Sequence, residues 1–232
     1  MRQPCSGYLF EADGTSLLLD CGFGTFETFL GLAVDTRVRA IVLSHAHRDH
    51  YADLGAYLDY ARALDHSIAV IASSATFVAL DGVADMSGAD LTNVDDEGQY
   101  SLGPFALEFS RTTHQIPTLG VRLSVSNRHV VYSADTGPNW RVPASWRRPD
   151  LAILECTYEH RDEAAWPYHL ASEDVAVLAQ EIEALTTLIT HVPPREHATQ
   201  RLRAVEIAAP RLLFALAELG QRIVFSVDDV YE

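Results

Sequence analysis

Short apolar stretches rich in β-branched residues alternate along the chain with longer stretches whose apolar residues recur every three or four positions. The short stretches favour β-strands, and the longer ones favour amphipathic helices. Helices are predicted over Ala52–Leu64 and over Ser172–Leu185, the second with Ser172 as its N-cap. A third helix is predicted over Gln200–Leu219, with a kink at Pro210. The predicted strands are Ser16–Asp20, Arg39–Ser44, Ile68–Ala72, Phe105–Ser110, Val121–Ser126, His129–Ala134, Leu151–Cys156, Thr187–Thr190 and Arg222–Val227.

No repeat, linker or break in composition divides the sequence. We therefore expect a single domain over residues 1–232, in which strands and helices mix in layers, as in the α/β (α+β) fold class. The polar segment Asp81–Gln99 is expected to be an excursion over the surface.

Acidic residues outnumber basic ones, since 32 Asp and Glu face 17 Lys and Arg and the net charge is −15. Such a charge repels polyanions at long range and disfavours a dedicated nucleic-acid binder. The three cysteines form no CxxC pair, so we expect a reducing compartment. No apolar run approaches the roughly 18 residues of a membrane span. Together these features predict a cytoplasmic globular protein without a membrane partner.

Residues able to bind metal crowd together directly after one predicted strand. The apolar run Ala40–Leu43 leads through Ser44 into His45, His47, Asp49 and His50. Alternation at the strand end places His45 and His47 on the same side, and Asp49 and His50 follow where the chain turns towards a helix. Imidazole and carboxylate are ligands that zinc prefers. A solvated polar loop is the alternative, and it does not account for this density of ligands.

One motif cannot complete a metal site, so further ligands are expected at the ends of later strands. His114, Asp135 and His191 each follow a β-rich run and precede a turn. Open sheets present reactive groups at one edge in this way. Each residue alone would more often be structural, but together with the first motif they predict one shared metal site.

The motif His45-x-His47-x-Asp49-His50, followed in order by His114, Asp135 and His191, resembles the metallo-β-lactamase superfamily over most of the chain. The resemblance implies an αββα sandwich with two Zn²⁺ ions per chain at one sheet edge, and Mn²⁺ or iron are alternatives because similar ligands accept several metals. It implies the following ligand sets: His45, His47 and His114 for the first ion, Asp49, His50 and His191 for the second, and Asp135 between them.

Two positions narrow the choice within that superfamily. Asp135 lies where one major class of true β-lactamases has a cysteine, so antibiotic hydrolysis is disfavoured. His47 lies where the di-iron flavoproteins carry a glutamate, so oxygen chemistry is disfavoured.

Two further segments, Glu155-Cys156-Thr157 and His169-Leu170, resemble the phosphodiesterase branch, which contains ribonuclease Z and the cyclic-nucleotide phosphodiesterases. The resemblance implies that His169 protonates the leaving oxygen and that Glu155 orients His169. A carboxylate partner suits this role because it selects the imidazole tautomer. A helix-capping His169 and a surface Glu155 are the structural alternatives.

Within this branch, the chain is most similar to actinobacterial cyclic-nucleotide-degrading phosphodiesterases. The similar segments are Cys5–Leu9, Tyr132–Gly137, His169–Leu170 and Thr190–Pro194. Two features depart from those relatives. The chain begins at Met1 without the strand that precedes this first segment in relatives, so we expect either that the fold lacks an N-terminal edge strand or that the given start is late. Arg48 replaces the small residue that is usual between the ligands.

The expected function is hydrolysis of a phosphodiester bond in a small, cyclic nucleotide by a dizinc-bridged hydroxide, with Asp49 orienting that hydroxide. Two zinc ions bring +4 and Asp49 and Asp135 bring −2, which leaves a local +2 to hold one phosphodiester on an acidic protein. A ribonuclease Z-like RNA endonuclease, a lactonase or thioesterase acting at the same site, and a non-catalytic binding module are the alternatives. The resemblance also implies a homodimer.

Overall fold

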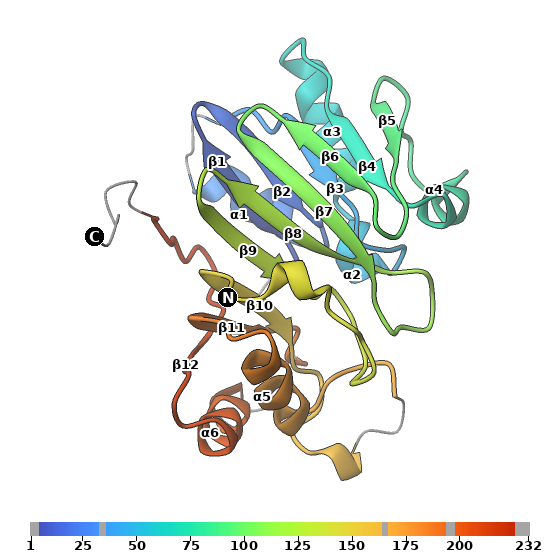
Figure 1. Ribbon diagram of the computed structural model, residues 1–232. Helices are drawn as coiled ribbons and strands as arrows, with labels where there is room; N and C mark the ends of the chain where they lie inside the picture. Colours follow the sequence, from blue (N-terminus) through green and yellow to red (C-terminus); the bar gives the residue numbers. More distant parts are fainter. Residues whose placement is uncertain (1–4, 33–35, 164–166, 194–197, 226–232) are drawn as a thin grey trace.

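The computed structural model describes residues 5–32, 36–163, 167–193 and 198–225, which form two β-sheets that face each other (Figure 1). The first sheet contains, in spatial order, β1 (Tyr8–Ala12), β2 (Thr15–Leu19), β3 (Ala40–Val42), β4 (Ala69–Ala72) and β5 (Asp90–Asn93). The second runs in space from β12 (Leu213–Leu216) through β11 (Thr186–Thr190), β10 (Leu151–Glu155), β9 (Arg128–Tyr132), β8 (Leu119–Val125) and β7 (Phe105–Arg111) to β6 (Gln99–Leu102).

Helices cover the outer face of each sheet. The first sheet is accompanied by α1 (Thr25–Gly31), α2 (Arg48–Tyr51), α3 (Leu54–Ala63) and α4 (Ser74–Leu80), and the second by α5 (Ser172–Glu181) and α6 (Ala198–Ala208). Short 3₁₀ turns lie at Ala144–Trp146 (η1) and Arg161–Glu163 (η2). None of the described helices is long and apolar enough to cross a membrane.

Alternation of side chains along the strands builds this four-layer arrangement. In β2, Leu17 and Leu19 face the opposite sheet, whereas Leu18 packs against α1 and α3. In β10, Ile153 points between the sheets and Leu154 packs against α5 and α6. Both faces of a central strand are therefore buried, which is why its sequence is apolar without interruption. The αββα sandwich and the mixed α/β class predicted from the sequence are confirmed.

The C-terminal part of the chain differs from the prediction. Helix α6 ends at Ala208, before Pro210, and the second half of the predicted helix Gln200–Leu219 is strand β12. Proline has no backbone N–H to donate, so the helix does not continue through it. Beyond it, Phe214 and Leu216 face the helices while Ala215 faces the other sheet, which is strand alternation.

The predicted strand Arg222–Val227 is also wrong where it can be assessed. Arg222–Phe225 have no regular secondary structure, and positions 226 and 227 lie outside the described residues. Val224 is 76% exposed, so its apolar character does not reflect burial in a sheet.

Both edge strands of the first sheet, and β6 at one edge of the second, were not predicted. Part of the supposed excursion Asp81–Gln99 is β5, which pairs in parallel with β4 at the edge of the first sheet. An edge strand has one open side, so it tolerates the polar residues that hid it in the sequence. At the opposite edge, β1 pairs antiparallel with β2, and its Tyr8 and Phe10 pack on the core between the sheets.

Helix α5 begins at the expected residue but with a different cap. Its N-cap is Ala171, not Ser172, and the Asp174 carboxylate accepts a hydrogen bond from the Ala171 N–H at 3.1 Å. Ser172 is instead buried, with its hydroxyl 3.6 Å from the Cys156 sulfur. The N–H of the N-cap residue is therefore satisfied by Asp174, a side chain inside the helix. A sequence search for an N-cap residue alone does not find this position.

The strand directions bring several loops to one edge of the sandwich. Strands β7, β9, β10 and β11 all run the same way, because β8 is antiparallel to both β7 and β9 and the remaining pairs are parallel. Their carboxyl ends, with the residues that follow them, therefore meet at a common edge. The His45–His50 segment follows strand β3 of the facing sheet and lies at the same edge.

Candidate metal centre

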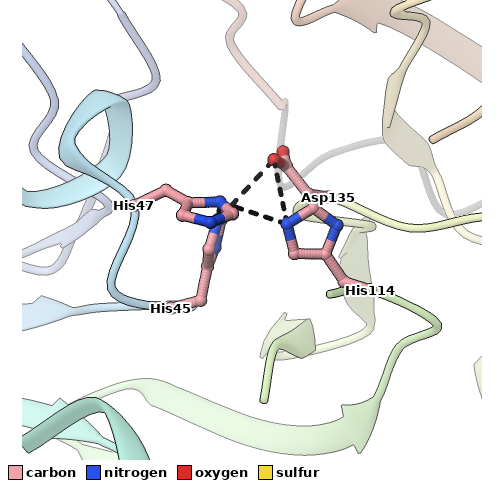
Figure 2. A group of neighbouring side chains, drawn as sticks. All are labelled: His45, His47, His114 and Asp135. Carbon is pink, nitrogen blue, oxygen red and sulfur yellow. Dashed lines mark hydrogen bonds and ion pairs between the residues drawn. The ribbon is translucent and has the colours of Figure 1, made fainter. Parts of the chain in front are cut away.

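Four of the predicted ligands form a first cluster. His45 and His47 follow β3, His114 follows β7 and Asp135 follows β9, and their side chains point towards one another (Figure 2). The His47 Nδ1 atom lies 3.0 Å from His45 Nε2 and 3.1 Å from His114 Nε2. Asp135 Oδ2 lies 3.6 Å from His45 Nε2 and 3.7 Å from His114 Nε2. Three imidazole nitrogens and one carboxylate oxygen thus surround one point.

A second cluster adjoins the first and contains Asp49, His50 and His191. Asp49 and His50 lie in the short helix α2, and His191 follows β11 with a left-handed φ of 54°. Asp49 Oδ2 lies 3.1 Å from His191 Nε2 and 3.8 Å from His50 Nε2. The side chain of His50 is fully buried, whereas that of Asp49 is 43% exposed, so this cluster opens towards solvent on the Asp49 side.

Asp135 lies between the two clusters and presents one oxygen to each. Its Oδ2 atom faces the first cluster, and its Oδ1 atom lies 3.2 Å from His50 Nε2 and 3.4 Å from His191 Nε2. The side chain is only 3% exposed. A carboxylate in this position can share its two oxygens between two cations.

The donor set fits a pair of divalent cations. Four bonds of about 2.0–2.1 Å in a tetrahedron place ligand atoms about 3.3 Å apart, and the first cluster spans separations of 3.0–3.7 Å. In the described part of the chain, His50 Nε2 and Asp135 Oδ1 are buried without any hydrogen-bond partner. Buried polar atoms are costly when unsatisfied, so a cation between these two atoms would complete their bonding. Nitrogen and carboxylate ligands together suit zinc, and they also accept other transition metals.

The protonation states fit the same interpretation. Burial lowers the pKa of His45, His47 and His114, which keeps these imidazoles in the neutral form that binds metal. Burial also opposes the charged forms of His191 and Asp135, but their mutual attraction is stronger. It raises the pKa of His191 to about 9 and helps to lower that of Asp135 well below its usual value. The carboxylate of Asp135 thus attracts positive charge to the second cluster, and a bound cation would supply it.

A buried aspartate behind the clusters was not predicted from the sequence. Asp20, which follows β2, accepts hydrogen bonds at 2.7 Å from His50 Nδ1 and at 2.8 Å from the Ser44 hydroxyl. Ser44 Oγ lies 3.0 Å from His45 Nδ1. Partners on the far nitrogen select the tautomer that leaves the other nitrogen free for a metal. The sequence feature that could have indicated Asp20 is its position as an acidic residue directly after the apolar run Leu17–Leu19.

Glu155 and His169 lie together beside the second cluster. Glu155 is the last residue of β10 and is 1% exposed, and its Oε1 atom lies 2.8 Å from His169 Nδ1. Burial opposes the imidazolium form of His169, but Glu155 outweighs it and raises the His169 pKa. His169, Asp135 and His191 bring ligand-type atoms within 4.8 Å of one another. His169 therefore faces the same space as the candidate metal ligands.

Every residue that the sequence analysis assigned to the site thus lies in one place. The polypeptide separates these residues widely, from His45 to His191, yet the sandwich brings them to a single edge. What the sequence missed are the hydrogen-bonding partners behind them, Asp20 and Ser44.

Residues 15–192 match the family described as the beta-lactamase superfamily domain, and this range covers most of the chain. The chain belongs to this family. Its sequence is 28% identical over 200 residues to the probable metallo-hydrolase YhfI of Bacillus subtilis, covering 83% of this chain and 81% of YhfI. It is 27% identical to a ribonuclease Z of Kineococcus radiotolerans, covering 94% of this chain and 85% of that protein.

Solved structures show the same fold. The crystal structure of YhfI from Bacillus subtilis, a metallo-beta-lactamase fold protein, superposes with a TM-score of 0.85 at 24% identity, covering 94% of this chain and 90% of YhfI. A diphosphatase of the PhnP family superposes with a TM-score of 0.77 at 19% identity, covering 95% of this chain and 84% of that one. The predicted superfamily is confirmed. The narrower cyclic-nucleotide branch stays a prediction.

Proposed function

We propose that this beta-lactamase superfamily member is a dizinc hydrolase that cleaves the phosphodiester bond of a small substrate, a cyclic nucleotide. The observation that carries the proposal is the Glu155–His169 pair beside the two ligand clusters. A metal centre alone suits many hydrolytic reactions, whereas an imidazole held by a buried carboxylate adds a proton donor for an alkoxide leaving group. The metallo-hydrolase and ribonuclease Z names of the relatives support the hydrolase class.

The residues that would hold the two ions are those of the two clusters. When bound, zinc ions polarise phosphoryl oxygens and generate a nucleophile from water near neutral pH. The chain itself supplies orientation. The Asp49 side chain is 43% exposed, so an attacking water could reach its carboxylate and donate a hydrogen bond to it. Asp49 Oδ2 lies 3.1 Å from His191 Nε2, the atom that His191 would offer to the second ion.

His169 is proposed as the general acid. Its Nδ1 atom is bonded to Glu155, so Nε2 is the nitrogen available to the substrate. The side chain is 19% exposed, which allows contact with a bound ligand. By holding a proton on Nε2 until the phosphorus–oxygen bond breaks, His169 would neutralise the leaving alkoxide.

The size of the substrate is inferred from charge. A protein of net charge −15 repels the distant phosphates of a long polyanion, and only the immediate surroundings of a cation pair offset this. The ribonuclease Z of Kineococcus radiotolerans is a relative by sequence, so cleavage of precursor tRNA is the alternative that the test must include.

A metal-defined hydrolysis screen tests the proposal. Purified zinc-loaded protein is assayed on 3′,5′-cyclic AMP, bis-p-nitrophenyl phosphate, precursor tRNA and a lactone, beside His169→Ala. We expect turnover of cyclic AMP that falls about 10²–10⁴-fold in His169→Ala. The loss should be smaller on bis-p-nitrophenyl phosphate, because p-nitrophenolate leaves without a proton.

His160→Ala is the matched control, since His160 lies in the segment between Glu155 and His169, belongs to neither ligand cluster and pairs with Glu173 at 3.2 Å. It should retain full activity. Activity on precursor tRNA alone would replace the small-diester proposal by the nuclease alternative. Lactone hydrolysis that is unchanged in His169→Ala, without diesterase activity, would replace it by the lactonase alternative.

A further inference from the structure

The hydroxyl of Thr157 lies between the general-acid pair and the metal ligands. Its Oγ1 atom is 2.8 Å from Glu155 Oε2 and 3.0 Å from His191 Nδ1, and it is 3.2 Å from His169 Nδ1. Thr157 thus contacts two residues with different proposed roles. Glu155 orients the general acid, and His191 is a ligand of the second cluster.

Counting protons gives these contacts a direction. A threonine hydroxyl has one hydrogen, and here it donates to Glu155, whose carboxylate oxygens only accept. Towards His191 the hydroxyl must then accept, so His191 Nδ1 carries the proton and donates. In the neutral imidazole this leaves a lone pair on Nε2, the atom that lies 3.1 Å from Asp49 and 3.4 Å from Asp135.

The same arrangement occurs a second time in the centre. Asp20 accepts a hydrogen bond directly from His50 Nδ1. It also accepts one from the Ser44 hydroxyl, which in turn contacts His45 Nδ1. Glu155 likewise binds His169 directly and meets His191 through Thr157. In each case one buried carboxylate and one hydroxyl serve two imidazoles, although the residues come from different strands of different sheets.

The backbone of Thr157 is held from another element. Arg201 of α6 is 1% exposed, and it donates from Nη2 to the Thr157 carbonyl at 2.8 Å and from Nε to the Cys156 carbonyl at 3.1 Å. A guanidinium fixes two successive carbonyls well because its donors form a rigid fork. The hydroxyl is therefore presented from a braced backbone and not from a free loop.

We propose that Thr157 is a positioning residue that extends the influence of Glu155 to His191, so that one carboxylate orients both the general acid and a ligand of the second metal. The inference rests on the proposed function for the identity of these two roles. It predicts that the hydroxyl of Thr157 matters for binding at the second cluster, and not only for proton transfer.

Thr157→Val and Thr157→Ser test this, because valine keeps the shape and removes the hydroxyl whereas serine keeps the hydroxyl. Stepwise zinc affinities are measured without substrate by competition with a chromogenic chelator, and cobalt-substituted protein reports the ligand geometry by absorption. We expect Thr157→Val to weaken the second zinc about 10–100-fold, with the first unchanged. Thr157→Ser should restore the affinity and the cobalt spectrum.

Thr187→Val is the matched control. Thr187 lies in β11, four residues before His191, is fully buried, and its hydroxyl has no hydrogen-bond partner among the described residues. This variant should bind both ions as the wild type does. Equal zinc affinities in Thr157→Val and wild type would overturn the inference, as would equal losses in Thr157→Val and Thr187→Val.

The affinity measurement separates this inference from the proposed function. Wild-type protein that binds two zinc ions but hydrolyses no phosphodiester would refute the proposed function, and a weakened second site in Thr157→Val would still support the role of Thr157. Wild-type protein that binds no second zinc would refute both.

Discussion

Asp20 illustrates how much of the candidate centre depends on single residues behind the ligands. Its carboxylate is fully buried and accepts hydrogen bonds from Ser44, His50 and Tyr132, with distances of 2.7–2.8 Å. The Oδ2 atom alone accepts from two hydroxyls and from His50 Nδ1. A buried carboxylate with this many donors is stabilised locally, and removing its charge leaves those donors with a weaker partner.

We therefore expect Asp20→Asn to weaken zinc binding about 10–100-fold, because His50 and His45 lose the charge that selects their tautomers. The free energy of unfolding should fall by about 1–3 kcal/mol, since the amide cannot accept from every donor around it. Isothermal titration with zinc and urea unfolding measure the two effects. Tyr132→Phe is the control, because it removes one donor to Asp20 that contacts no ligand, and it should leave zinc affinity unchanged.

At the scale of elements, the ligands are positioned by loops that pass one another at backbone contact. The loop after β2 lies against helix α2, where the Cys21 N–H donates to the His50 carbonyl at 2.7 Å. A Cβ placed on Gly22 would lie 1.9 Å from the Asp49 carbonyl oxygen. A Cβ placed on Gly137, after β9, would lie 1.8 Å from the Pro167 carbonyl oxygen. Glycine is required at both positions because any side chain would separate the loops that carry the ligands.

Gly22→Ala should therefore destabilise the fold by about 1–3 kcal/mol or more and displace α2, because the methyl group collides with backbone that cannot rotate away. Gly55→Ala is the contrasting variant, because we expect it to stabilise the protein. Gly55 lies in α3, and nothing surrounds its Cβ position within 4 Å, so alanine should stabilise the protein by about 0.4–1 kcal/mol. Urea denaturation midpoints check both. Similar midpoints for the two variants would contradict this account of the loop contact.

At the scale of the whole molecule, the two sheets each contribute candidate metal ligands to a shared point. The His45–His50 segment belongs to the first sheet, and His114, Asp135 and His191 follow strands of the second. A cation bound there would link the two halves of the sandwich. Metal that binds only the folded chain adds its binding free energy to the free energy of unfolding.

Removal of bound metal should consequently lower the melting temperature. A free zinc concentration 100-fold above Kd adds about 2.7 kcal/mol, which corresponds to about 5–10 °C for a chain of this length. Differential scanning calorimetry with and without a chelator measures the shift. Asp135→Asn, which lacks the carboxylate between the clusters, should show a much smaller response. The same melting temperature for wild type in zinc and in chelator would rule out a stabilising metal.

The sequence determined those features of this protein that local patterns encode. Uninterrupted apolar runs predicted the central strands, and the density of ligand residues from His45 to His50 predicted the metal-binding segment. Glu155 and His169 were predicted from their resemblance to a known branch. Edge strands such as β5 and the strand β12 beyond Pro210 escaped, because their side chains are polar or partly exposed and the pattern of burial is weak there.

The tertiary structure alone decided which hydroxyls and carboxylates lie behind the ligands. Asp20 reaches His50 and Tyr132 across 30 and 112 positions of the chain, and Thr157 reaches His191 across 34. No periodicity connects residues so far apart, since their contacts depend on the packing of two sheets and on the direction in which each strand ends. Hydrogen bonds are short and directional, so these partnerships exist only once that packing has formed.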